Sequence, residues 1–142
     1  MAASIIEKTP QILQFNTTVI YVENNVKNIL NFYVTAFGFQ IKYYDDNLKF
    51  GELETGGPTI MISSYQAGEF MVGSHFERSK DKRPSDIELA FMTPDVPTAY
   101  ARAIASGAKS VREPKTFDWG QTAAYVNSIE DRRNVDRFTY AY

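Results

Sequence analysis

The sequence predicts an α+β fold in which two βαβββ repeats form an open, mixed-sheet half-barrel. Two observations favour this fold. A strand followed by a helix occurs twice, about 70 residues apart, and short strand-like segments follow each helix. The 142 residues are 44% hydrophobic, enough for one compact domain and too few for two ordinary ones. We therefore expect a single domain over residues 1–142, with repeat one at about 12–63, a linker at about 64–86 and repeat two at about 87–142.

The first repeat begins with an alternating segment, Thr17–Val22, which is typical of a strand. After a polar turn, apolar residues from Val26 to Phe37 recur with the spacing of one helix face, and Gly38 is placed to end that helix. Turn-rich segments at 45–47 and 56–58 then separate three predicted strands. These strands are Gln40–Tyr44, Lys49–Glu54 and Thr59–Ser63.

The second repeat follows the same plan in nearly the same register. Ile87–Met92 is the predicted strand, and a helical face runs from Val96 to Ile104 before Gly107. The three strands predicted after it are Lys109–Arg112, Thr122–Val126 and Val135–Tyr142. A unit of this size cannot bury its own sheet face, so we expect the repeats to pair or to exchange between chains.

The linker over residues 64–86 shows no clear hydrophobic period. A segment of this length is either a connection anchored by a few aromatic side chains or a lid over a site. It contains His75, the only histidine of the chain. A lone histidine in a polar segment is more often solvated than catalytic.

Composition excludes several classes of function. The 15 Lys and Arg residues and 17 Asp and Glu residues give a net charge of -2, which provides no broad basic field for nucleic acid. Without cysteine the chain has no disulfide, thiolate nucleophile or thiolate metal site. No apolar run approaches the roughly 18 residues that span a bilayer, and the N-terminus lacks the features of a targeting segment. We expect a soluble, cytoplasmic protein with neither nucleic acid nor a membrane as partner.

A few side chains stand out as site candidates. Glu88 lies within an apolar strand, where a carboxylate is costly to bury unless it is paired or ligating. It is either a catalytic or metal-binding group on the inner face, or an outward-facing residue paired with a cation. Trp119 either covers a ligand or plugs the end of the half-barrel, and Gln121 could offer an amide to the same ligand. Three strand residues could line a pocket or serve core and dimer packing: Tyr43, Phe50 and Met61.

Local motifs add a resemblance to these patterns. They are Asn31–Phe39, Gly51–Gly57, Ile87–Phe91 with Asp95 and Val96, Ala105–Ala108 and Trp119–Val126. Together, over about residues 15–126, they resemble the vicinal oxygen chelate superfamily of glyoxalases, extradiol dioxygenases, fosfomycin-resistance enzymes and bleomycin-resistance proteins. The resemblance implies paired βαβββ units, and it is specific to the superfamily without being specific to one reaction.

The resemblance also implies where a metal would be held. Metal-dependent members use one ligand from the first strand and one from the last strand of each repeat. By register these positions are Thr18 or the adjacent Thr17, Glu88, and the vicinities of Ile62 and Val135. Most of these side chains are poor ligands. A one-residue slip of the last strand would bring Asp136 to the inner face beside Glu88. We expect no cofactor, and a divalent metal at Glu88 and Asp136 stays the alternative.

Two functions follow from the resemblance. The first is a glyoxalase-type lyase or isomerase fold with a degraded metal site and Glu88 as the catalytic carboxylate. The alternative is a metal-independent, antibiotic-sequestering dimer of the bleomycin-resistance type, whose acidic balance and aromatic content suit a planar cation. A third possibility is a structural or regulatory dimer. We expect a homodimer with a small-molecule ligand, because an open eight-stranded sheet leaves edges and an apolar concave face.

Overall fold

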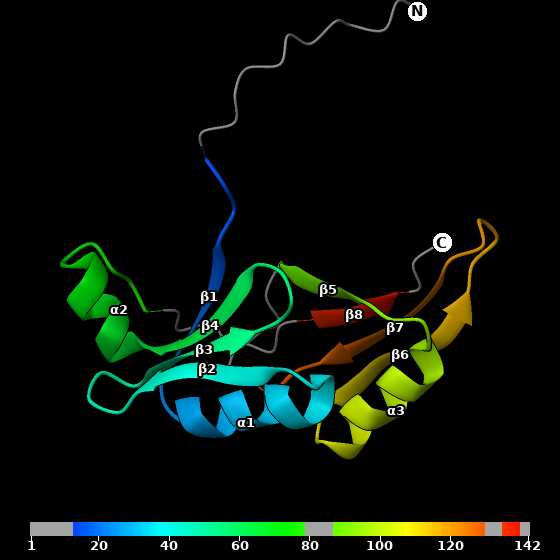
Figure 1. The fold of residues 1–142 in the computed structure, drawn as a ribbon, viewed down its shortest axis with the longest axis horizontal. Helices are drawn as coiled ribbons and strands as arrows, with labels where there is room; N and C mark the ends of the chain where they lie inside the picture. Colours follow the sequence, from blue (N-terminus) through cyan, green and yellow to red (C-terminus); the bar gives the residue numbers. More distant parts are fainter. Residues whose placement is uncertain (1–12, 79–86, 130–134, 140–142) are drawn as a thin grey trace, which may run out of the picture.

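The structure is a computed structural model that describes residues 13–78, 87–129 and 135–139, the last of these by backbone alone. Its strands and helices confirm the predicted α+β class and the βαβββ order of both repeats (Figure 1). The first repeat consists of β1 (Thr17–Val22), α1 (Val26–Phe37), β2 (Gln40–Asp45), β3 (Phe50–Glu54) and β4 (Thr59–Ser64), followed by α2 (Tyr65–Val72). The second consists of β5 (Glu88–Met92), α3 (Val96–Ala105), β6 (Lys109–Thr116), β7 (Thr122–Asn127) and β8 (Val135–Thr139).

The strands form two separate sheets of four. Their orders are β1-β4-β3-β2 and β5-β8-β7-β6, and the first and last strands of each repeat pair in parallel while the other pairs are antiparallel. The expectation of one open eight-stranded sheet is therefore wrong for the described strands. The parallel pair completes each sheet within its own repeat, which leaves β1 and β5 as edge strands.

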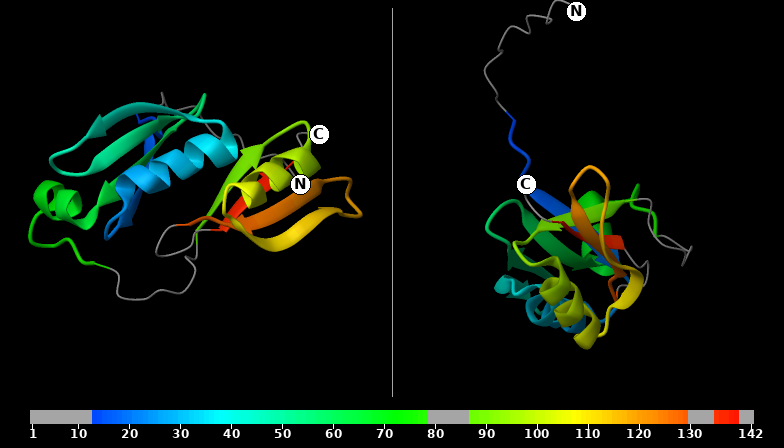
Figure 2. Two further views of the ribbon diagram at one scale, coloured as in Figure 1. Left: turned by 90° about the horizontal axis from the view of Figure 1, so that it is seen from below. Right: turned by 90° about the vertical axis from the view of Figure 1, so that its right-hand side faces the viewer.

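The repeats meet through their helices. Helices α1 and α3 lie side by side on one face of the two sheets (Figures 1 and 2), and they contact each other directly. The core fills the layer between helices and sheets, with Ile29, Leu30 and Tyr33 of α1 buried against Leu53 and Ile62 of the first sheet. Helix α1 ends as predicted at Gly38, which has a φ of 77° and donates its N–H to the Val34 carbonyl. Neither α1 nor α3 covers the opposite face of either sheet (Figures 1 and 2).

The linker contains a helix that the sequence did not predict. Ser64 begins α2, because its hydroxyl accepts a hydrogen bond from the Ala67 N–H at 3.0 Å and donates one to the Leu48 carbonyl at 2.6 Å. Phe76 packs edge-on against Tyr21 of β1, with ring centroids 4.9 Å apart, so the segment is attached to the first sheet. His75 is exposed. The remainder of the linker, residues 79–86, lies outside the described residues.

Strand β6 is longer than expected, because it continues through Pro114 to Thr116. Proline lacks a backbone donor, but β6 is the outer strand of its sheet, where that loss is tolerated. A tight hairpin then returns the chain to β7, with hydrogen bonds from the Phe117 N–H to the Gln121 carbonyl and from the Gly120 N–H to the Phe117 carbonyl. Among the residues described, none of the helices combines the length and apolar character that crossing a membrane requires.

Candidate functional site

The open face of the first sheet gathers the strand residues that the sequence singled out. Leu53, Ile60 and Ile62 point into the core, so the alternate residues of β3 and β4 point to the other face. There the register aligns Tyr43 of β2 with Glu52 of β3, and Glu52 with Met61 of β4. These three side chains form a row across the sheet.

Phe50 extends this row into a small aromatic surface. Its ring lies 5.9 Å from that of Tyr43, which is 51% exposed. The structure thus brings together Tyr43, Phe50 and Met61, which the sequence proposed as ligand-binding residues. It adds Glu52, which the sequence analysis missed. Glu52 could have been found from its place in the alternation of β3, between Gly51 and Leu53 on the core side.

Glu52 is half-buried in this row. Within the described part of the chain, no hydrogen bond or ion pair engages it. A carboxylate in apolar and aromatic surroundings without a partner is unusual, because its desolvation is not offset. We refer to Tyr43, Phe50, Glu52 and Met61 as the first-sheet patch.

Glu88 begins β5, an edge strand of the second sheet, whereas the first-sheet patch belongs to the other sheet. Leu89 and Phe91 pack against the core, so Glu88 shares the open face of β5 with Ala90 and Met92. Glu88 is exposed, and Met92 is 70% exposed. The Glu88 side chain is therefore not buried in the core between the sheets and the helices.

Trp119 and Gln121 lie together at the tip of the β6–β7 hairpin. The Trp119 indole N–H donates to Oε1 of Gln121 at 3.0 Å, and the ring stacks on Phe117 with centroids 4.8 Å apart and planes at 10°. The guanidinium of Arg112 lies 5.5 Å from the centre of the Phe117 ring. Trp119 is 68% exposed and does not fill the core. Its hairpin joins β6 and β7 of the second sheet, whereas the first-sheet patch belongs to the other sheet (Figure 1). The ligand-binding residues proposed from the sequence are therefore divided between the two sheets of a single chain.

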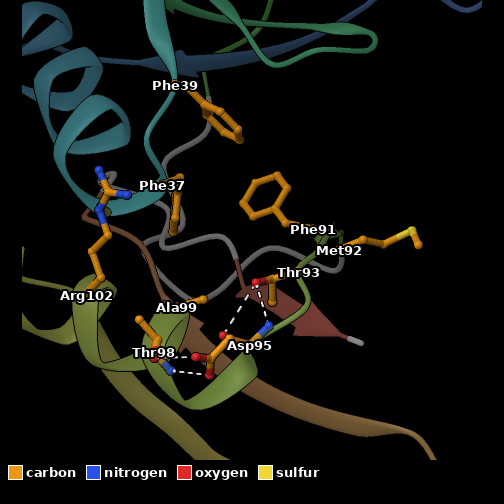
Figure 3. Close-up of a pocket in the computed structure, with 10 residues that line it drawn as sticks. Phe37, Phe39, Phe91, Met92, Thr93, Asp95, Thr98, Ala99 and Arg102 are labelled. Atoms are coloured by element: carbon orange, nitrogen blue, oxygen red, sulfur yellow. Dashed lines mark hydrogen bonds between the residues drawn. The ribbon is translucent and has the colours of Figure 1, made fainter. Parts of the chain in front are cut away.

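A cavity of about 290 Å³ lies elsewhere, where the end of α1 meets β5 and the start of α3 (Figure 3). Phe37, Phe39 and Phe91 line it together with Asp95 and Arg102. The sequence analysis did not select these residues for a site. The sequence placed Phe37 in a predicted helix and Phe91 in a predicted strand, and Phe39 and Asp95 drew notice only as parts of the local motifs.

Asp95 has an electrostatic role that the geometry explains. Its Oδ2 accepts a hydrogen bond from the Thr98 hydroxyl at 2.7 Å, and its Oδ1 accepts one from the Thr98 N–H at 3.1 Å. These bonds, the hydroxyl one first, lower the pKa of Asp95 below its ordinary value. The carboxylate therefore stays ionised at neutral pH as the N-cap of α3.

The arrangement of two βαβββ units with open sheet faces agrees with a comparison of the sequence with family models. The model of the Glyoxalase/Bleomycin resistance protein/Dioxygenase superfamily matches residues 14–136. The chain belongs to this superfamily. Among curated proteins, none matches the sequence significantly.

Several solved structures share the fold at low sequence identity. A glyoxalase/bleomycin resistance protein/dioxygenase family enzyme from Burkholderia phytofirmans PsJN is 22% identical over 92% of this chain and 100% of its own, with a TM-score of 0.72. A glyoxalase/bleomycin resistance protein/dioxygenase from Nocardioides is 15% identical over 93% and 85%, with a TM-score of 0.73. TioX from Micromonospora sp. ML1 is 18% identical over 89% and 99%, with a TM-score of 0.63. At these identities the likeness establishes the fold.

The side chains at the implied ligand positions of the superfamily do not fit a divalent ion. Thr18 lies on the same face of β1 as Ile20, which packs against the core, and Ile62 is fully buried. Glu88 is the one carboxylate at a described position. The backbone of Asp136 pairs with Leu89 in the parallel register, but its side chain lies outside the described ones. No three His, Asp or Glu side chains gather into a metal-holding group within the described residues.

Proposed function

We propose that this superfamily member binds a planar organic cation on the first-sheet patch without a resident metal, and that it does so as a homodimer. The observation that carries the proposal is Glu52, a half-buried residue in a row with Tyr43 and Met61 whose carboxylate is engaged by no described partner. A cation would offset its desolvation. The rings of Tyr43 and Phe50, 5.9 Å apart, add flat faces that attract cations.

A second copy of the chain is part of the proposal because side chains in and beside the patch stay exposed in one chain. Tyr43 is about half exposed. Val19 lies on the edge strand β1, where its backbone pairs with that of Met61, and it is 36% exposed. Met92 and Val111 of the second repeat expose still more apolar surface. Sheet edges and apolar faces of this kind favour association between copies. Light scattering at micromolar protein should give a mass of two chains, and a mass of one chain would remove the dimer from the proposal.

Fluorescence titration with ethidium, a planar cation that brightens in apolar surroundings, tests the ligand class. Glu52→Gln keeps the shape of the side chain and removes the charge, so we expect the affinity to fall about fivefold to tenfold, the range of a partly desolvated cation contact. Glu23→Gln is the matched control, since it removes the same charge in the exposed turn after β1. An equal loss in both variants, or no saturable binding, would contradict the proposal.

The ring contribution is tested separately. Phe50→Leu removes one wall of the patch and should weaken ethidium binding, whereas Phe70→Leu changes an exposed ring of α2 that is no part of the patch. If the two changes act alike, ethidium binds non-specifically to apolar surface and the patch is not its site.

A lyase or isomerase with Glu88 as the catalytic carboxylate is the second candidate, favoured by the position of Glu88 on an open sheet face. Thermal melting of chelator-stripped protein with Zn²⁺, Ni²⁺, Mn²⁺ or Fe²⁺ distinguishes the two functions, because a ligand of the native state raises the midpoint by mass action. Our proposal predicts no metal-dependent rise. A rise of several degrees that Glu88→Gln abolishes would favour the second candidate.

A further inference from the structure

The cavity between the repeats differs in place and in chemistry from the first-sheet patch. It lies on the helix side of the sheets, where α1 ends beside α3 (Figure 3), and its volume is about 290 Å³. This is the lower end of the range for small-molecule sites, so a compact ligand would fit it.

Three aromatic rings from both repeats form its apolar wall. The Phe91 ring of β5 lies 5.0 Å from that of Phe37 and 5.3 Å from that of Phe39. Each ring is only half-buried, so part of its surface faces the cavity. A further aromatic ring could pack against these in the tilted and edge-on geometries that the three already adopt with one another.

The two charged residues at the cavity, Asp95 and Arg102, differ in how many of their polar atoms form hydrogen bonds within the protein. Both carboxylate oxygens of Asp95 already accept hydrogen bonds from Thr98. Arg102 has only its Nε engaged, as a donor to the Thr35 carbonyl at 2.8 Å. None of the described residues accepts a hydrogen bond from its Nη1 or Nη2. Of these two charged groups, the guanidinium of Arg102 is therefore the one whose outer N–H groups have no described acceptor.

Gly38 lets the guanidinium lie where it does. A Cβ at this position would be 3.1 Å from Nη1 and 3.4 Å from Nη2 of Arg102, so a larger residue would displace the group. One hydrogen bond, to the Thr35 carbonyl, orients the exposed Arg102 side chain at the end of α1, and the absence of a side chain at Gly38 leaves room for its guanidinium. A guanidinium oriented in this way, with two parallel N–H groups that no described residue engages, suits a carboxylate.

We propose that this cavity is a second binding site and that it takes a small monocarboxylate with an aromatic body. Arg102 would pair with the carboxylate while Phe37, Phe39 and Phe91 contact the ring. Asp95 keeps its charge, but its oxygens are oriented toward Thr98 as the cap of α3, whereas the outer N–H groups of Arg102 have no described acceptor, so we expect the cavity to prefer an anionic ligand to a cationic one.

Titration calorimetry with three isosteres tests the ligand class: phenylacetate, its neutral counterpart 2-phenylacetamide, and the cation 2-phenylethylamine. We expect saturable binding of phenylacetate, at least tenfold weaker binding of the amide and none of the amine. Arg102→Gln should weaken phenylacetate at least tenfold, and Arg112→Gln, the same change on the hairpin, should leave it unchanged.

Ala99→Leu tests the cavity without removing Arg102. Ala99 lines the cavity from α3, so the larger side chain occupies the space and should abolish phenylacetate binding in a protein with unchanged far-ultraviolet circular dichroism. Glu52→Gln should not affect it, which separates this site from the first-sheet patch. Binding that survives Ala99→Leu, equal binding of the amide, preferential binding of the amine, or no saturable binding of phenylacetate would each overturn the proposal. Should Arg102→Gln fail to fold, Ala99→Leu decides alone.

Discussion

The two repeats share one topology but fill it with side chains of different size. The fully buried side chains of the first repeat include Tyr33, Leu30, Leu53 and Ile62. Among the described side chains of the second repeat, which do not include those of β8, the fully buried ones are small: the alanines Ala103, Ala123 and Ala124, together with Val96 and Val126. Strand order alone therefore does not determine how strongly a repeat is held together.

The difference in burial makes the second repeat dependent on the first. Nearly every residue of β6 is exposed, and part of the apolar surface of α3 is covered by α1 rather than by its own sheet. Helix α3 covers the end of α1 in return, but the first repeat has the larger buried side chains within its own core. We expect the first repeat to contribute more of the free energy of unfolding.

Truncation of one core residue in each repeat tests this comparison most directly. Leu30→Ala should lower the free energy of unfolding by about 2–5 kcal/mol. Val126→Ala removes fewer buried methyl groups and should cost roughly 1–2 kcal/mol. Urea unfolding at one protein concentration measures both. Equal losses in the free energy of unfolding would show that the core of the second repeat contributes as much to stability as the core of the first.

Overpacking the first core should be the next largest effect. A Cβ on Gly51 would collide with a methyl group of Leu30, so Gly51→Ala should cost about 1–3 kcal/mol. The cost should shrink in the Leu30→Ala background, where the space is open. Gly57→Ala is the control, because nothing lies within 4 Å of its Cβ position. Additive costs of the two changes would mean that they do not share this contact.

Removing a hydrogen bond between the two repeats should lower the free energy of unfolding by less than the core substitutions do. Arg102→Gln removes the hydrogen bond to the Thr35 carbonyl and should cost about 1 kcal/mol. Trp119 is the only tryptophan and lies in the second repeat, so its fluorescence follows that repeat, whereas circular dichroism follows both. We expect the two signals to change together in the wild-type protein. Separate transitions there would show that the repeats unfold independently.

The smallest predicted effect is a pH dependence at the start of α3. Because the pKa of Asp95 is lowered from 3.8, its charged form stabilises the folded protein above that pH, and the contribution is lost as the pH falls through the lowered pKa. The difference in melting temperature between wild type and Asp95→Asn should therefore narrow below about pH 4. A difference that stays constant from neutral pH to pH 2 would contradict this assignment.

Glu69 of α2, which follows the first repeat, is a second carboxyl group whose pKa is lowered by a hydrogen bond. A hydrogen bond from Arg78, at 2.7 Å, lowers its pKa from 4.5, but both side chains are about half exposed. Salt should weaken this ion pair, whereas the Thr98 hydrogen bonds of Asp95 do not depend on a counter-charge. Melting curves of Glu69→Gln and Asp95→Asn in low and high salt check the difference.

Elements with a strong period and a glycine stop were predicted well from the sequence. The strand Thr17–Val22 and the helix ending before Gly38 agree with the structure. Helix α2 was missed because its buried residues, Tyr65, Ala67 and Gly68, do not form an apolar stripe at helical spacing. The length of β6 was missed because proline signals a break unless the strand is known to be an edge strand.

The candidate sites were harder to predict because they depend on which elements become neighbours. The sequence selected Tyr43, Phe50 and Met61 as pocket residues, and strand register places them on one face. The sequence also placed Trp119 between two strands of the second repeat, but it did not reveal that the strands of the two repeats form separate sheets. The cavity beside Arg102 arises only where α1 and α3 meet, a contact between residues far apart in the sequence.

The contact between Phe37 and Phe91 has a consequence for synthesis on the ribosome. All four strands and the helix of the first repeat lie within residues 17–64, so this unit can form while the rest of the chain is still being made. Until residues 87–105 emerge, however, Ala36 and Phe37 at the end of α1 lack the rings and the helix that later cover them. The large core of the first repeat thus has to hold the nascent unit together while part of its helix stays exposed to chaperones and to other chains.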